Sequence, residues 1–91
     1  MNSTAPQGLI QISPGFRFQW EEVQQAYVLL FPEGMITLNA SSAEILKRCD
    51  GTRTAAEIVS DLQRQFPDAD LSNDVHEFLE VAHDKGWIRG R

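Results

Sequence analysis

The chain has 91 residues, which is enough for one domain and too few for two separate cores. Hydrophobic residues make up 42% and charged residues 23%, which is typical of a globular protein and excludes a disordered chain, a collagen-like repeat or a membrane protein. The formal net charge of −5 predicts a surface that repels phosphate, which argues against nucleic-acid and anionic-membrane partners.

The first residues predict a flexible tail. Residues 1–8 are polar, have no charged side chain and lack the apolar segment of a secretion signal. We therefore expect a cytoplasmic protein in which residues 9–91 form a single domain.

Three strands are predicted next. Residues Phe16–Glu21 alternate apolar and polar side chains, as a half-buried strand does, and this places Phe16, Phe18 and Trp20 on one face. Residues 21–25 form a polar loop, and Ala26–Phe31 is apolar on both faces, as in a central strand. Met35–Leu38 is the return strand.

The turn before that return strand contains Phe31-Pro32-Glu33-Gly34. Pro32 favours the first turn position, and Gly34 can adopt a left-handed conformation. We expect a three-residue hairpin loop with a bulge at Gly34.

The hydrophobic period then changes from that of strands to that of helices. Ser41 and Glu44 have the spacing of a capping box, which predicts the start of a first helix that Gly51 ends. Thr54 and Glu57 repeat the box, and Pro67 ends the second helix. A third helix begins between residues 71 and 74 and ends at Gly86.

The predicted fold is α+β and winged-helix-like, with a three-stranded antiparallel β-meander followed by three α-helices that cover one face of the sheet. The third strand, Met35–Leu38, has no charge and no proline to block its free edge. Such an edge is an aggregation liability, a dimer contact or a site for an added peptide strand, and the residues alone favour a dimer and a peptide equally.

Neither catalysis nor metal binding is indicated. Cys49, the single cysteine, falls on the apolar face of the first helix and is expected in the core. His76 and His83 stand seven positions apart on the third helix, about 10 Å, too far to share one metal ion. We expect a non-enzyme with no cofactor and no metal.

A small winged-helix DNA-binding regulator is the alternative. Its third helix would enter the major groove, where arginine and lysine make the contacts. Here that helix offers Lys85 against four acids, which disfavours DNA: Asp74, Glu77, Glu80 and Asp84.

An ordered set of short motifs resembles the PqqD family from about residue 14 onward. They are Leu29-Leu30-Phe31-Pro32-Glu33-Gly34, Leu38-Asn39, Ala43-Glu44-Ile45-Leu46, Cys49-Asp50-Gly51, Thr54, Glu57-Ile58, Leu62, Asp74-Val75, Phe78-Leu79 and Gly86-Trp87. Phe31 departs from the family pattern, where tyrosine is expected before the turn.

The resemblance implies a function and a site. PqqD proteins bind the ribosomal precursor peptide PqqA and present it to PqqE, a radical S-adenosylmethionine enzyme of pyrroloquinoline quinone (PQQ) biosynthesis. Their relatives hold a leader peptide as an extra strand beside the third helix. In this sequence the implied peptide-binding residues are Met35, Ile36, Thr37, Leu38, Asn39, Val75, Phe78, Leu79 and Ala82. Core packing is the ordinary alternative for the helix residues.

Self-association is expected to be weak. The polar loop at residues 21–25 joins the first strand to the rest of a small core, so exchange of the N-terminal hairpin between two copies costs little. We expect a monomer in solution and a hairpin-swapped dimer only at high concentration.

Overall fold

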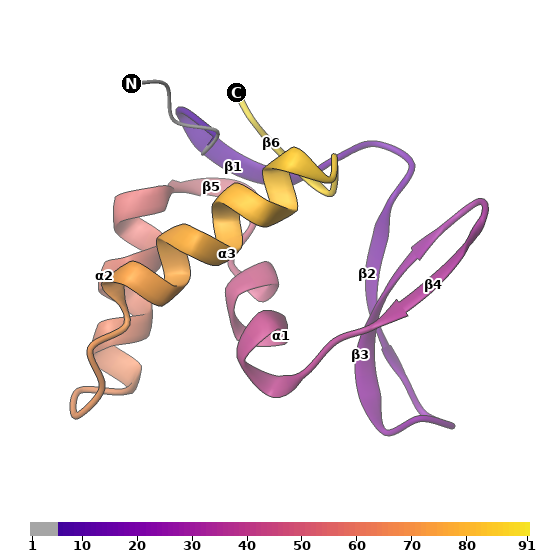
Figure 1. Ribbon diagram of the computed structural model, residues 1–91, viewed down its shortest axis with the longest axis horizontal. Coiled ribbons are helices and arrows are strands. Elements are labelled where there is room, and N and C mark those ends of the chain that lie inside the picture. Colours follow the sequence, from indigo (N-terminus) through magenta and orange to yellow (C-terminus); the bar gives the residue numbers. More distant parts are fainter. Residues whose placement is uncertain (1–5) are drawn as a thin grey trace.

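The computed structural model describes residues 6–91, which form two three-stranded antiparallel sheets and three helices. Figure 1 shows one sheet projecting from the body of the molecule and the other lying behind helix α3. In chain order the elements are β1 (Leu9–Ile12), β2 (Arg17–Glu21), β3 (Ala26–Phe31), β4 (Gly34–Thr37), α1 (Ala40–Lys47), β5 (Asp50–Thr54), α2 (Ala55–Gln65), α3 (Ser72–Asp84) and β6 (Ile88–Gly90).

The predicted meander is the sheet β2-β3-β4, with β3 in the centre. The ring of Phe18 stacks on Tyr27 with centroids 4.8 Å apart, and the ring of Trp20 meets Tyr27 edge-on at 5.2 Å. Phe16 contacts Phe31 on the same side of the sheet, at 5.5 Å. The prediction that Phe16, Phe18 and Trp20 share a face is therefore confirmed.

The turn between β3 and β4 differs from the expected bulged loop. Phe31 pairs directly with Gly34, so Pro32 and Glu33 form a two-residue loop. Gly34 is not among the residues with positive φ, so the predicted left-handed glycine is wrong. Gln25, in the preceding turn, has the left-handed conformation instead, with φ of 53°.

A second sheet, in the order β5-β1-β6, was not predicted. Its strands come from three distant parts of the chain, and β1 pairs with both of the others. The backbones of Leu9 and Arg91 exchange hydrogen bonds of 3.2 and 3.0 Å. The fold is α+β, but the expected order of three strands followed by three helices is wrong because β5 separates α1 from α2 and β6 follows α3.

The N-cap of helix α1 lies two residues before the predicted one, Ser41. Asn39 is the N-cap, and its Oδ1 accepts hydrogen bonds from the backbone of Ser42 (2.8 Å) and from Ser41 Oγ (3.1 Å). Glu44 does not reach back to the cap, because its carboxylate pairs with Lys47 and Arg48. The predicted Ser41–Glu44 box is therefore wrong.

Helix α2 begins with the capping box that the sequence predicts. Thr54 Oγ1 accepts from the backbone N–H of Glu57, and the Glu57 carboxylate accepts from the N–H of Thr54. The helix ends at Gln65, shortly before Pro67. Helix α3 begins at Ser72, inside the predicted window, and ends at Asp84 before Gly86.

The helices do not cover the meander as expected. Helix α1 packs on β3, whereas α2 packs mainly on β5 and α3, and α3 packs mainly on α2 and β6. Figure 1 shows α1 between the meander and the pair α2–α3. The core therefore joins both sheets through α1, and its buried residues are Ile10, Leu29, Leu38, Ala43, Ile45, Leu46, Cys49, Ile58, Leu62, Val75, Leu79, Ala82 and Ile88.

The expected tail, residues 1–8, falls largely on residues 1–5, which lie outside the described residues. Pro6 is buried, and the chain enters β1 at Leu9. Between residues 6 and 91, none of the helices has the length and hydropathy needed to cross a membrane.

Candidate functional site

The outer edge of the meander is β4, which pairs with β3 on one side and has no second strand partner among the described residues. The backbone N–H of Leu38 donates to Tyr27 across the β3–β4 ladder at 2.9 Å. Because N–H groups alternate in direction along an antiparallel strand, Ile36 also faces β3. The N–H and C=O groups of Met35 and Thr37 therefore face the open edge.

The side chains of the predicted strand residues lie on both faces of the sheet. Ile36 is partly buried against the core, and Leu38 is fully part of it. Met35 and Thr37 are on the other face, where Gln24 contacts both: Thr37 Oγ1 donates to Gln24 Oε1 at 2.5 Å. Asn39 lies past the strand and caps α1. The open edge of β4 is therefore formed by backbone N–H and C=O groups, as strand addition requires.

The four predicted residues of α3 divide into two groups. Leu79 and Ala82 are 0% exposed and belong to the core. Val75 is also buried, but it lines a pocket, and Phe78 is half-buried at the same pocket. The structure therefore brings Val75 and Phe78 to a common surface and assigns Leu79 and Ala82 to packing.

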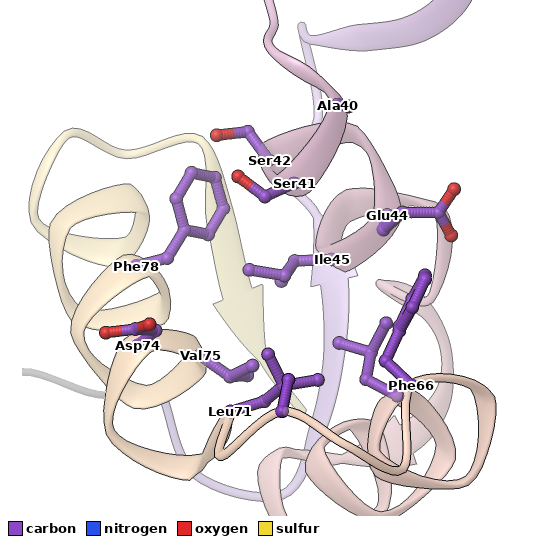
Figure 2. Close-up of a pocket in the computed structure, with 12 residues that line it drawn as sticks. Ala40, Ser41, Ser42, Glu44, Ile45, Phe66, Leu71, Asp74, Val75 and Phe78 are labelled. Carbon is purple, nitrogen blue, oxygen red and sulfur yellow. The ribbon is translucent and has the colours of Figure 1, made fainter.

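That pocket has a volume of about 550 Å³ and lies between α1, α2, α3 and the loop that joins α2 to α3. Figure 2 shows Phe78 near Ser41 and Ser42 at one end, Phe66 and Leu71 at the other, and Ile45 between them. The lining residues that the sequence did not predict as peptide-binding are Ala40, Ser41, Ser42, Glu44, Ile45, Leu62, Phe66, Ala69, Leu71 and Asp74. One feature of the sequence could have indicated this pocket: Phe66 stands directly before Pro67 at the end of a predicted helix.

A smaller pocket of about 320 Å³ lies on the other side of α1. Leu38 and Asn39 line it together with Trp20 and Tyr27. The ammonium group of Lys47 lies 5.1 Å from the centre of the Tyr27 ring, a cation–π distance. Ala40 and Glu44 of α1 line both pockets, and neither lining includes a residue of β4.

Arg48 holds α1 against α2. Its guanidinium donates to Asp61 at 2.6 Å, to Glu44 at 3.0 Å and to Gln65, while only 13% of the side chain is exposed. The hydrogen bond from Arg48 lowers the pKa of the Glu44 carboxyl against an opposing effect of burial, and Lys47 lowers it further. The same guanidinium lowers the pKa of Asp61. Of these residues, Glu44 also lines the larger pocket.

Cys49 is buried as predicted, but it follows the end of α1 (Ala40–Lys47) and is not on the helix as the sequence suggested. Its Sγ donates to the carbonyl of Ile45 at 3.4 Å, and burial raises its pKa to about 12. His76 is exposed and His83 is half-buried on α3. Within residues 6–91, no cluster of three or more histidine, cysteine or acidic side chains could hold a metal ion.

Comparisons with known proteins indicate one family. The family described as "Coenzyme PQQ synthesis protein D (PqqD)" matches residues 26–88. A protein of Azotobacter vinelandii named PqqA binding protein is 49% identical over 89 residues, 97% of each chain. A protein of the same name from Methylococcus capsulatus is 48% identical over 87 residues, 96% of this chain and 94% of its own.

A solved structure is similar over the whole fold. It is the solution NMR structure of the PqqD truncation of Methylobacterium extorquens PqqCD, described as a functional and stand-alone recognition element for ribosomally synthesised and post-translationally modified peptides. The TM-score is 0.70 at 28% identity, covering 98% of this chain and 99% of that one.

Proposed function

The chain belongs to the PqqD family, and on that premise we propose that it binds the precursor peptide PqqA along the open edge of β4 and presents it to PqqE in PQQ biosynthesis. Relatives about half identical to it are named PqqA binding proteins, and its structural neighbour is described as a recognition element. These names describe peptide binding and recognition, so we assign no reaction and no cofactor to the chain. The cytoplasm remains the proposed location.

The observation that carries the proposal is the edge of β4. Met35 and Thr37 direct backbone donors and acceptors outward, and β4 contains no charged residue and no proline to oppose a further strand. An extended peptide gains backbone hydrogen bonds there without displacing any element of the fold. The strand residues and Val75 and Phe78 of α3 are the proposed contacts.

The DNA-binding alternative gains no support from the fold. The exposed face of α3 presents Asp74, Glu77 and Asp84 to solvent, and Lys85 lies at the far end of the helix. A phosphate backbone approaching this face would meet carboxylates along most of its length.

Calorimetric titration with synthetic PqqA tests the binding step. We expect one peptide per chain and no turnover of the peptide, with a scrambled peptide of the same composition as the control. A Kd of about 1 mM or weaker for PqqA, no tighter than that of the scrambled peptide, would refute the proposal.

The presentation step needs PqqE in the same experiment. We expect size-exclusion chromatography to show a ternary complex, in which this chain increases the amount of PqqA that elutes with PqqE. Competition, in which PqqE displaces PqqA from the chain, would retain binding and refute presentation.

A further inference from the structure

The smaller pocket, between α1 and the strands β2 and β3, has the composition of a site for a cation. Its volume of about 320 Å³ falls in the range of about 300–1,000 Å³ that ligand pockets occupy. We propose that it receives an arginine side chain of PqqE, the enzyme to which the peptide is presented. The inference rests on the proposed presentation step and adds to it a docking surface and its chemistry.

Two aromatic rings form the wall that the meander contributes to this pocket. Trp20 of β2 and Tyr27 of β3 pair directly across the two strands, and their rings meet edge-on with centroids 5.2 Å apart. The faces of such rings attract cations, and a planar guanidinium also stacks on them. Trp20 is 45% exposed, so a large part of its ring can contact a partner.

The turn after β2 holds the exposed ring of Trp20 in place. Trp20 Nε1 donates to one carboxylate oxygen of Glu22 at 3.0 Å, and the other oxygen accepts from Gln25 Nε2 at 2.8 Å. Gln25 itself lines the pocket. A side chain that is already ordered loses less conformational freedom on binding, and tryptophan is among the residues that contribute most to interfaces. The turn therefore favours Trp20 as a contact residue.

Glu44 supplies the negative charge from the opposite wall. It lines the smaller pocket, and Figure 2 shows its carboxylate turned away from the larger one. Arg48 Nη1 holds the carboxylate with a contact of 3.0 Å to Oε1. Each carboxylate oxygen can accept two hydrogen bonds, so Glu44 can accept a further one from an incoming guanidinium.

Lys47 is a cation of the chain itself at the same wall. Its Nζ lies 3.2 Å from Glu44 Oε2 and 5.1 Å from the centre of the Tyr27 ring. A carboxylate and an aromatic ring are thus already shared by one positive charge, which is the arrangement proposed for arginine. The Lys47 side chain is 40% exposed, so an arginine that enters the pocket competes with it for Glu44 at little cost in burial.

The position of the pocket favours the enzyme over the peptide as the source of the arginine. None of the residues of β4 lines it, so a peptide strand that pairs with β4 leaves its lining free. Figure 1 shows the sheet β2-β3-β4 projecting from the rest of the molecule, where a large partner can reach it. The net charge of −5 attracts a basic partner surface.

A small probe tests the cation site without any partner. Methylguanidinium, titrated at concentrations that leave the protein folded, should shift the indole N–H signal of Trp20 in a saturable way and leave that of Trp87 unchanged. Glu44→Gln should abolish the saturable shift, because it removes the charge and keeps the shape. Equal shifts at both tryptophans, or a shift that Glu44→Gln leaves unchanged, would refute the site.

Removal of the competing lysine should have the opposite effect. Lys47→Met should strengthen methylguanidinium binding at least about threefold, because Glu44 and Tyr27 lose their internal cation. Lys85→Met is the matched control: it removes the same charge from a lysine 6.0 Å from the Trp87 ring, and it should leave the titration of Trp20 unchanged. Equal changes in the two variants would reduce the effect to net charge and contradict the proposal.

The complex with PqqE tests the identity of the partner. Trp20→Leu and Glu44→Gln should each weaken PqqE binding at least about tenfold by calorimetry. Glu77→Gln, which is exposed on α3 and outside both pockets, should change it less than about threefold. Trp20→Leu should bind PqqA alone like the parent.

The outcomes separate this inference from the proposed function. Parent-like PqqE affinity of Trp20→Leu and Glu44→Gln, both folded by circular dichroism, would overturn the docking surface and leave peptide binding and presentation intact. A loss of PqqA affinity in Trp20→Leu would assign the pocket to the peptide and also overturn the inference. Absence of PqqE binding by the parent would overturn the presentation step and the inference together.

Discussion

Two neighbouring proline substitutions in β4 should have opposite effects. Thr37 directs its N–H to the open edge and Ile36 directs its N–H to β3. Thr37→Pro should therefore leave the fold intact and weaken PqqA binding, because proline is tolerated on the free side of an edge strand. Ile36→Pro should first lower the stability, since it removes a hydrogen bond of the β3–β4 ladder.

The size of the effect follows from the groups at the edge. Met35 and Thr37 together offer about four outward backbone groups, each worth a net ~0.5–1.5 kcal/mol when paired. Removing one donor also leaves a peptide carbonyl without a partner. We expect Thr37→Pro to cost about 1.4 kcal/mol or more, a tenfold rise in Kd by calorimetry.

Thr37→Val is the matched control because it keeps the N–H and removes only the hydroxyl that donates to Gln24. It should bind PqqA like the parent. The reasoning fails if Thr37→Pro, folded by circular dichroism, binds as tightly as the parent, or if Thr37→Val loses as much affinity as the proline variant.

The network at Arg48 gives a stability test, in which Arg48→Met should cost about 1–2 kcal/mol of unfolding free energy and lower Tm by roughly 5–15 °C. The side chain of Arg64 is 72% exposed, so Arg64→Met should cost under about 0.5 kcal/mol. Equal losses in the two variants would contradict the role assigned to Arg48. The pKa values of Glu44 and Asp61 are lowered in the folded state, so these carboxylates stabilise the fold fully above their unfolded pKa values of about 4, and the stabilisation disappears as the pH falls through the folded pKa values. Urea unfolding should show this loss of stability for the parent and a smaller loss for Arg48→Met. A parent stability that does not change with pH would contradict the prediction. Cys49 should react with thiol reagents only at the rate of unfolding, and rapid labelling of the native protein would contradict its burial. Sedimentation at low micromolar concentration should show a monomer, and a dimer there would overturn that expectation.

The sequence predicted the elements whose signals are local. The alternation in Phe16–Glu21, the apolar run in Ala26–Phe31 and the capping box at Thr54 each depend on neighbours a few residues away, and all three appear in the structure. The second sheet depends on pairing between distant segments. Its strand β5, Asp50–Thr54, is polar and becomes a strand only because β1 pairs with it.

The candidate site was partly predictable for the same reason. An edge without charge or proline is visible in Met35–Leu38, and its open side is confirmed by the sheet order. Helical spacing put Val75, Phe78 and Leu79 on one apolar stripe, but it could not separate the pocket side of that stripe from the core side. That separation depends on how α1 and the loop after α2 pack against α3, so Phe66 and Ala69 carried no comparable signal.

The pairing of Leu9 with Arg91 has a practical consequence for engineering. The two ends of the fold meet in the sheet β5-β1-β6, and Figure 1 shows them at the side of the molecule away from the β3–β4 turn. A short Gly-Ser linker could join them, with new ends opened in the Glu22–Gln25 turn, to give a circular permutant that keeps every strand pair. A surface tether or fusion partner attached at Arg91 would likewise leave the edge of β4 uncovered.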